Sequence, residues 1–404
     1  MKIGIIGAGA SGMMAALSAA ENSQNEIILL ERQARVGKKL LATGNGRCNL
    51  SNRDADKGGY HGNEPGFSAH ARKVFSVADT LRYFERIGLM TVQEASGKIY
   101  PYSDQANSVV DVLRFALQKP NIQLLTGFDV KKVRHTDDGF LVCSDEETIA
   151  CDRLIVACGG LAGTKLGGSM SGYKILSQFG HKSTRLRPAL VQLKTAFDGI
   201  TALKGIRANC HITILHDDKT YAEDTGEIQF TDYGISGPVV FQISRDVCYG
   251  PGNWSAKIDF LPHIAEDELF DVLCRRRSTQ LNAEDLLTGI LHNRLGKVLT
   301  RCAGLRDQKK IAELTDEQLR WVCQAVKGFI LQLTEPMGMD CAQVTAGGVL
   351  TCGFNDRTME SKLVPGLYAC GEVLDIDGDC GGYNLQWAWS SGRLAGCSAG
   401  KENL

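Results

Sequence analysis

The stretch KIGIIGAGASGMMAALSAAENSQNEIILLE, residues 2–31, decides the fold of this 404-residue chain. A short apolar run stops at a glycine, a small-residue segment suited to a helix follows, and a second apolar run ends on an acid. Within it, Gly7, Gly9 and Gly12 match the pattern G-x-G-x-x-G. The first glycine permits a tight turn, the second lets the backbone approach a pyrophosphate, and the third lets helix and strand pack closely. The stretch therefore predicts a βαβ unit that binds a dinucleotide.

The acid that ends this stretch supports the same interpretation. Glu31 follows Gly7 by 24 positions and is placed to accept hydrogen bonds from a ribose diol. The start of the intervening helix offers free N–H groups and a partial positive charge to phosphates. A glycine-rich turn without a ligand is the alternative, and it leaves Glu31 unexplained.

Composition excludes several other classes of protein. The formal net charge of -1 gives no support to a nucleic-acid footprint over the whole surface. The 14 cysteines are scattered singly without a CxxC pair, which argues against zinc ribbons and thioredoxin-like sites, and we expect no metal. No uncharged apolar run approaches the roughly 20 residues that span a bilayer. We expect a cytoplasmic protein with reduced thiols and no membrane partner.

Two later segments identify the dinucleotide. CDRLIVACGG, residues 151–160, predicts a strand that runs into Gly159 and Gly160. VPGLYACGEVLDIDGDCGGYNLQWAWSSG, residues 364–392, predicts another strand, an acid and a helix that starts near Gly382. The positive end of that helix would face the N1–C2=O edge of a flavin and stabilise its reduced, anionic form. A nicotinamide dehydrogenase needs no such distant segment, so the three segments favour FAD on an α/β, two-dinucleotide-type Rossmann domain.

Longer motifs extend this pattern over the whole chain. RVGKKLLATGNGRCNLSN (35–52), GKIYPYSDQANSVVDVL (97–113), GISGP (234–238) and the segment from TAGGV (345–349) to residue 392 together resemble the BaiN/RdsA family of flavoproteins, also called aminoacetone-oxidase-like. The resemblance implies non-covalent FAD, an inserted β-barrel and a helical subdomain. It also implies contacts to the cofactor. Those to its ADP half come from Gly7, Ala8, Gly9, Ala10, Ser11, Gly12, Glu31, Arg32, Val130 (main chain to adenine), Cys158 and Gly159; those to its flavin half and pyrophosphate come from Asn45, Gly46, Arg47, Cys48, Asn49, Gly371, Glu372, Gly382, Tyr383, Asn384 and Leu385.

Two parts of this set leave alternatives open. Cys158 stands where relatives more often have threonine, which puts one hydrogen bond in doubt. The GNGRCN loop, residues 44–49, is interpreted as a flavin contact, with Arg47 supplying charge beside phosphate or flavin oxygens. A redox-active Cys48 is the alternative, but flavin disulfide reductases use paired cysteines and this loop has one. Tyr383, Cys48 and Tyr100 are the candidate catalytic proton donors, with Tyr100 in an expected loop at 97–107.

The middle of the chain predicts an insert. Residues 191–263 show short β-like runs, and residues 264–326 contain helical patterns. Asn282 suits the N-cap of one helix, and Thr315 with Gln318 forms a capping box for another. We expect a Rossmann domain at 1–190 and 341–404, a β-barrel at 191–263 and 327–340, and a helical subdomain at 264–326.

The expected activity is that of an FAD-dependent oxidoreductase, because the cofactor itself supplies the difficult step. Resemblance to the family implies reduction of an activated C=C bond in an enone of the 3-dehydro-Δ4,6 bile-acid or steroid type. Hydride would come from NADH or NADPH, binding transiently, through flavin N5. The alternatives are reduction of uracil in ribosomal RNA, an aminoacetone-type amine oxidase that uses O2, and a flavin-binding module or redox sensor without turnover. The balanced charge favours a small-molecule substrate; the oligomeric state is left open.

Overall fold

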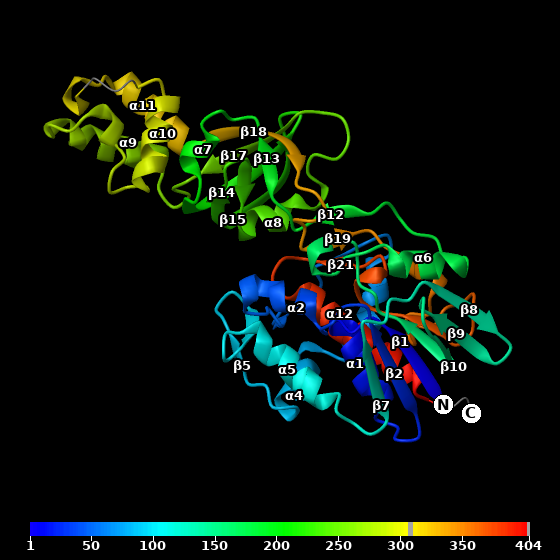
Figure 1. Ribbon diagram of the computed structural model, residues 1–404. Coiled ribbons are helices and arrows are strands. Elements are labelled where there is room, and N and C mark those ends of the chain that lie inside the picture. The colour runs from blue at the N-terminus through cyan, green and yellow to red at the C-terminus, as the bar shows by residue number, and fades with distance from the viewer. Residues whose placement is uncertain (306–309, 402–404) are drawn as a thin grey trace. The chain divides into compact units, whose positions relative to one another are not determined.

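The computed structural model describes residues 1–305 and 310–401 and divides into two compact units. The first unit comprises Met1–Pro188 with Met339–Leu404, and the second comprises Ala189–Gly338 (Figure 1). The sequence placed the boundaries of the Rossmann domain at residues 190 and 341, and each lies two residues from the observed boundary of the first unit. The helices expected as a subdomain at 264–326 share one hydrophobic core with the barrel.

A five-stranded parallel sheet forms the centre of the first unit. Its strand order is β20-β11-β1-β2-β7, and all four pairings are parallel. Strands β1, β2 and β11 are buried along most of their length, as expected inside a parallel sheet covered on both faces, which explains their runs of Ile, Leu and Val. The strands are β1 (Lys2–Ile6), β2 (Glu26–Glu31), β7 (Ile122–Thr126), β11 (Arg153–Val156) and β20 (Leu367–Ala369).

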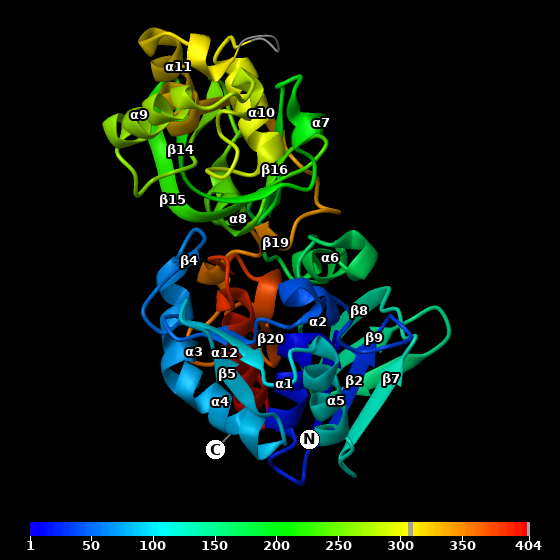
Figure 2. The same ribbon diagram turned by 90° about the vertical axis from the view of Figure 1, so that its left-hand side faces the viewer.

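Two helices far apart in the sequence pack against each other in this unit. These are α1 (Ala10–Ala19) and α12 (Tyr383–Ala399), which lie side by side (Figure 2). A Cβ atom on Gly392 would overlap the carbonyl oxygen of Ser11, and one on Gly396 would overlap that of Ala15. The glycines of α12 thus permit a close approach that brings the C-terminal segment onto the first βαβ unit.

Smaller elements complete the first unit. Three short sheets are formed by β8 (Lys132–Thr136), β9 (Gly139–Cys143) and β10 (Thr148–Cys151), by β3 (Ser51–Asn52), β6 (Lys98–Pro101) and β5 (Thr91–Gln93), and by β4 (Tyr60–His61) with β21 (Asp377–Gly378). The remaining helices and strands are α2 (Lys38–Ala42), α3 (Ser68–Val74), α4 (Val77–Arg86), α5 (Ala106–Ala116), α6 (Ser171–Gln178), β12 (Arg187–Ala189, at the boundary) and β19 (Val344–Ala346).

The second unit is a closed barrel with attached helices. The barrel order is β13-β16-β15-β14-β17-β18, which confirms the expected β-barrel insert. Its strands are β13 (Leu193–Thr195), β14 (Arg207–His216), β15 (Lys219–Phe230), β16 (Gly234–Ser236), β17 (Trp254–Asp259) and β18 (Phe329–Pro336). Its helices are α7 (Ile200–Leu203), α8 (Pro238–Ile243), α9 (Glu266–Arg275), α10 (Asn293–Cys302) and α11 (Asp316–Lys327).

One helix start in the second unit is confirmed and another is wrong. The Thr315 side chain accepts a hydrogen bond from the Gln318 N–H at the start of α11, as the capping box predicts. At Asn282 only a 3-10 turn forms, Ala283–Asp285, and its side chain makes no capping bond. The chain is interrupted at Gly289, whose φ of 81° is incompatible with a continuing helix, and α10 begins later. Within the described ranges, no helix combines the length and apolar character that crossing a membrane requires.

Candidate functional site: a dinucleotide cradle and a polar cluster

The glycine turn after β1 has the geometry that its motif requires. Gly7 has a φ of 104°, and a Cβ atom there would lie 2.5 Å from the carbonyl oxygen of Ala157. A Cβ atom on Gly12 would overlap the carbonyl oxygen of Gly7. Gly9 differs from both, because no heavy atom lies within 4 Å of its Cβ position. Two glycines therefore serve packing, and the third faces open space where a phosphate group can approach the backbone.

Helix α1 begins directly at this open space. Its N-cap is Gly9, which has no side chain to satisfy the first-turn N–H groups of Ala10 and Ser11. Those groups are therefore available to an anionic ligand.

The acid at the end of β2 is held against the same turn. Glu31 Oε2 accepts the Ala8 N–H at 2.9 Å, and Oε1 accepts the Gln33 N–H at 2.8 Å. A carboxylate has further lone pairs, so these contacts fix its position and leave capacity for ribose hydroxyls. The neighbouring Arg32 guanidinium donates to the carbonyl oxygen of Gly167.

The expected adenosine side contains main-chain groups suited to a ligand. Val130 is buried, and neither its N–H nor its C=O hydrogen bonds to another residue within the described part of the chain. Gly159 has a φ of 69° and no heavy atom within 4 Å of its Cβ position. Cys158 donates weakly through Sγ to the Ile6 carbonyl at 3.6 Å. Burial raises the pKa of this thiol to about 12, so it remains a donor at neutral pH.

The GNGRCN loop forms a tight turn. Gly44 and Asn45 have left-handed φ values of 57° and 56°, and Asn45 and Gly46 are exposed. Arg47 pairs with Asp104 and, at 2.9 Å, with Glu94. The structure thus gives the Arg47 charge two protein partners, and its predicted contact with cofactor oxygens stays a prediction.

Cys48 has the properties of a packed side chain. It is fully buried, and burial raises the pKa of its thiol to about 12. Because a nucleophilic or redox-active thiol must ionise near neutral pH, this environment argues against a catalytic Cys48. The buried Asn49 beside it can donate its amide hydrogens to the carbonyl oxygens of Ser51 at 3.0 Å and Ile99 at 3.3 Å.

Tyr100 does not lie in the loop that the sequence predicted. It belongs to strand β6, where it is buried and covered by the Arg47 guanidinium, 3.9 Å from the ring centroid. Burial raises the pKa of its hydroxyl. The strand was missed because it has only four residues, too few to show an alternating pattern. A buried ring under a cation is a poor candidate for proton donation to a substrate.

Glu372, the acid in the segment 364–392, is held by an ion pair with a lysine that was not predicted from the sequence. Glu372 Oε2 pairs with Lys39 Nζ at 2.7 Å, and Oε1 accepts the Thr345 N–H at 2.8 Å. The preceding Gly371 has a φ of 76°, and a Cβ atom there would lie 2.5 Å from Ser11 Oγ. This turn therefore sits against the start of α1, beside the glycine turn.

Helix α12 also begins with unsatisfied N–H groups. Its N-cap is Gly382, with a φ of 105° and no side-chain cap. The Asn384 amide turns back instead, donating to the Gly378 carbonyl at 2.7 Å and accepting the Gly378 N–H at 2.8 Å. Leu385 is partly buried and packs on the core. The helix start thus leaves its first N–H groups without a side-chain cap, and its contact with a flavin edge stays a prediction.

A polar cluster that sequence reasoning did not find surrounds this helix start. His61 Nε2 lies 2.7 Å from Asp379 Oδ1, and the Tyr60 hydroxyl donates to the Tyr383 carbonyl at 3.2 Å. A Cβ atom on Gly59 would lie 2.7 Å from both the Asp379 carboxylate and the Tyr383 ring, so these two side chains meet at Gly59. Burial, and then the Asp379 charge, raise the pKa of the Tyr383 hydroxyl. His61, Asp379 and Tyr383 are referred to below as the α12 cluster.

Together these features fit FAD. Two helix starts without caps, open space over Gly9 and Gly159, and the unpaired main chain of Val130 lie on one unit, with a carboxylate at the end of β2. Within residues 1–305 and 310–401, no group of three or more His, Cys, Asp or Glu side chains is arranged to hold a metal ion.

Comparison with known proteins agrees with this geometry. Residues 1–398 match the family described as HI0933-like protein Rossmann domain. The chain is 39% identical over 404 residues to a 3-dehydro-bile acid delta(4,6)-reductase of Clostridium scindens, covering 98% of each chain. It is 32% identical over 393 residues to a ribosomal RNA dihydrouridine synthase of Escherichia coli, covering 96% of this chain and 95% of that one.

A solved structure of a 3-ketosteroid delta1-dehydrogenase from Sterolibacterium denitrificans aligns over 98% of this chain and 99% of that chain, with 10% identity and a TM-score of 0.49. That similarity is too low to carry a conclusion. The family match spans nearly the whole chain. The chain therefore belongs to the HI0933-like family of FAD-binding Rossmann oxidoreductases, of the BaiN/RdsA type.

Proposed function

We propose that this protein reduces an activated C=C bond of an enone, of the 3-dehydro-Δ4,6 bile-acid or steroid-like type, with NADH or NADPH as the hydride donor. The observation that carries the proposal is the 39% identity to a 3-dehydro-bile acid delta(4,6)-reductase over 98% of both chains. The balanced charge of the chain is consistent with a small substrate rather than a polyanion.

Bound FAD would supply the two-electron chemistry of the reaction. The first βαβ unit would hold its ADP half, with the N–H groups of α1 on the pyrophosphate and Glu31 on the ribose. The start of α12 would face the other end of the cofactor, where its N–H groups stabilise negative charge. Lys39 keeps Glu372 in one orientation beside the start of α1.

Reduction of an enone also needs a proton at the carbon next to the one that receives hydride. The α12 cluster contains two groups that carry an acidic hydrogen, the Tyr383 hydroxyl and the His61 imidazole. Asp379 accepts from His61 and would keep its ring oriented. We propose the proton donor from this cluster, with Tyr383 first because it is the first residue of α12, the helix start proposed to face the flavin.

Anaerobic stopped-flow absorbance tests the proposal. We expect NADH or NADPH to bleach the flavin, and a 3-oxo-Δ4,6 steroid acid to restore the oxidised spectrum with loss of the dienone absorbance. Rapid bleaching by aminoacetone, with neither nicotinamide effective, would establish the oxidase alternative instead. If no donor reduces the flavin, the protein is a binding module or sensor.

One alternative substrate has a specific observation in its favour. Ribosomal RNA dihydrouridine synthases of two organisms are 32% and 30% identical to this chain over nearly its full length. The same stopped-flow experiment with a uracil-containing ribosomal RNA fragment, and filter binding of that fragment at two salt concentrations, separates the two substrates. Reoxidation by RNA but not by the enone would replace the steroid-like substrate with uracil.

A further inference from the structure

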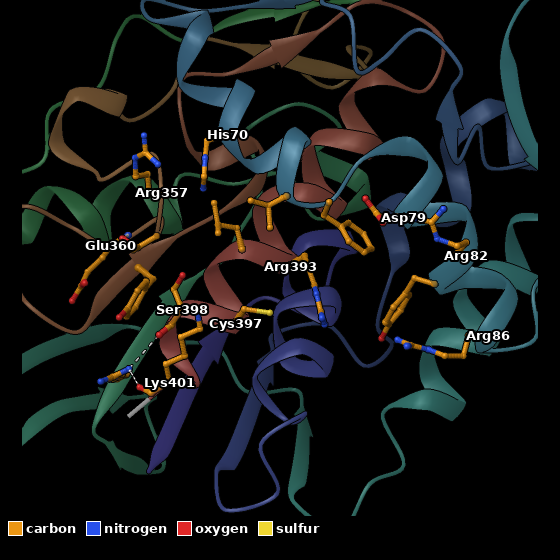
Figure 3. A pocket seen from close by; sticks show the side chains of 17 residues that line it. His70, Asp79, Arg82, Arg86, Arg357, Glu360, Arg393, Cys397, Ser398 and Lys401 are labelled. Carbon is orange, nitrogen blue, oxygen red and sulfur yellow. Dashed lines mark hydrogen bonds and ion pairs between the residues drawn. The ribbon is translucent and has the colours of Figure 1, made fainter. Parts of the chain in front are cut away.

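A second pocket lies on the first unit, apart from the dinucleotide cradle. Its volume is about 870 Å³, which lies in the usual range for small-molecule sites. Side chains from α3, α4, the C-terminal half of α12 and the segment 357–360 converge on it (Figure 3).

The floor of this pocket is apolar. Phe75 and Tyr83 are buried and pack edge to face, with ring centroids 6.0 Å apart. Val74, Leu394 and the buried ring of Tyr368 extend the same surface. Such a floor would bind the hydrocarbon or aromatic body of a ligand.

The charged residues around this floor are mostly cationic. Six lysines and arginines line the pocket against two acids, Asp79 and Glu360; the cations are Arg82, Arg86, Arg153, Arg357, Arg393 and Lys401. Figure 3 shows Arg82 and Arg86 on one side, Arg357 and Lys401 on the other, and Arg393 between them.

Three of these cations already form an ion pair or hydrogen bonds with other residues of the protein. Arg82 pairs with Asp79 at 2.5 Å, Arg393 binds Glu21, and Arg153 donates to the carbonyl oxygens of Ala399 at 2.9 Å and Lys401 at 2.6 Å.

The other three cations are without an acidic partner in the described part of the chain. Arg86 stacks over the Tyr83 ring at 5.0 Å, and the side chains of Arg357 and Lys401 make no ion pair with a described residue. The second acid, Glu360, keeps its charge although its Oε1 accepts the Gly366 N–H at 2.8 Å, and a single carboxylate still leaves these three cations in excess. A local excess of positive charge thus surrounds an apolar floor in a chain whose net charge is -1. Cations gathered around a low-dielectric surface attract an anion strongly.

We infer that this pocket binds an amphipathic organic anion, with an apolar body on the floor and an acidic head group among Arg86, Arg357 and Lys401. The ligand would not be a reactant at the flavin. The α12 residues of the pocket start at Arg393, ten residues after Tyr383, and at 1.5 Å per residue this is about 15 Å along the helix. Reacting atoms must approach to about 3–3.5 Å. The inference is therefore independent of the proposed function.

A matched pair of probes tests this site in the FAD-loaded protein. 8-Anilinonaphthalene-1-sulfonate and N-phenyl-1-naphthylamine share one ring system, and only the first carries a negative charge. We expect equilibrium dialysis to show one site for the sulfonate, with at least about tenfold weaker binding of the neutral amine.

Variants locate that site. The double substitution Arg86→Ala with Arg357→Ala should weaken sulfonate binding by about tenfold or more. Val74→Trp, at a side chain that is 48% exposed, should fill the pocket and reduce binding without disturbing the core. Arg134→Ala, on the exposed face of β8, removes a charge elsewhere and should leave binding unchanged. The inference fails if the sulfonate does not bind, if both probes bind equally, or if the double variant and Val74→Trp bind it like the unaltered protein.

Discussion

Two glycines of one motif should respond in opposite ways to the same substitution. Gly9→Ala adds a methyl group where no heavy atom lies within 4 Å, at a φ of -84° and ψ of -166° that alanine adopts readily. Alanine is a poorer N-cap than glycine, which costs at most about 1 kcal/mol of stability. Gly12→Ala instead drives a methyl group into the Gly7 carbonyl oxygen, inside a packed turn. Overpacking of this kind costs about 1–3 kcal/mol or more, because the backbone of the turn must move.

Gly9→Ala, which should disturb stability the less, should instead show a clear loss of FAD affinity. The Gly9 methyl group would stand between the backbone and the pyrophosphate, and we expect a loss of about 2.7 kcal/mol, or about 100-fold in the dissociation constant of FAD. Urea unfolding of the apoprotein gives the first quantity, and titration of flavin fluorescence gives the second. Gly66→Ala, also at a position without neighbours within 4 Å, is the control and should change neither. Unaltered FAD affinity in Gly9→Ala, or unfolding of that variant at the urea concentration of Gly12→Ala, would refute the assignment of roles.

Three further predictions concern protons and thiols. In stopped-flow experiments, Tyr383→Phe should slow reoxidation of the flavin by the enone by about 100-fold, because general-acid catalysis contributes about that much. Reduction of the flavin by the nicotinamide should be unchanged. If the variant and the unaltered protein reoxidise at the same rate, His61 is left as the donor. In native protein at pH 8, mass spectrometry should find iodoacetamide on exposed Cys352 and not on buried Cys48, whose pKa is about 12. Burial raises the pKa of the Cys48 and Cys370 thiols from 9.0 to about 12, so the folded state holds protons that the unfolded chain releases. Their contribution to stability is complete below pH 9 and should be lost as the pH rises toward about 12, which urea midpoints at pH 7.5 and pH 10 would show.

The part of the site that the sequence predicts is the part that is local in the chain. The glycine turn, α1 and Glu31 lie within one βαβ unit, where each residue's role follows from its spacing. Strand character in the insert was predictable where a strand is long enough to alternate, as in the ten residues of β14, whereas the barrel was expected from the family resemblance. By contrast, β6 has four residues, and its strand character comes from pairing with β5 and β3. Pairing with distant strands leaves no signal in so short a segment.

The contacts that sequence reasoning missed join residues very far apart. His61 and Asp379 are separated by 318 positions, and Lys39 and Glu372 by 333. No period or spacing rule connects such pairs, because each depends on how the C-terminal segment returns to the first βαβ unit. Arg47 shows the same limit in another form. Its charge suggested a cofactor contact, and only the fold reveals that Asp104 and Glu94 also pair with this charge.

The C-terminal segment can pack against α1 because glycines stand at the points of contact. Gly371, Gly392 and Gly396 each stand where a Cβ atom would press on or overlap α1. A bulkier residue at Gly392 or Gly396 would push α12 away from α1, and the start of α12 carries Tyr383 next to Asp379. The proposed proton donor is thus positioned relative to the dinucleotide cradle by helix packing as well as by its contacts with Tyr60 and Gly59. Substitutions along the α1–α12 interface should for this reason weaken proton transfer and cofactor binding together, whereas substitution of Tyr383 alone should affect only the first.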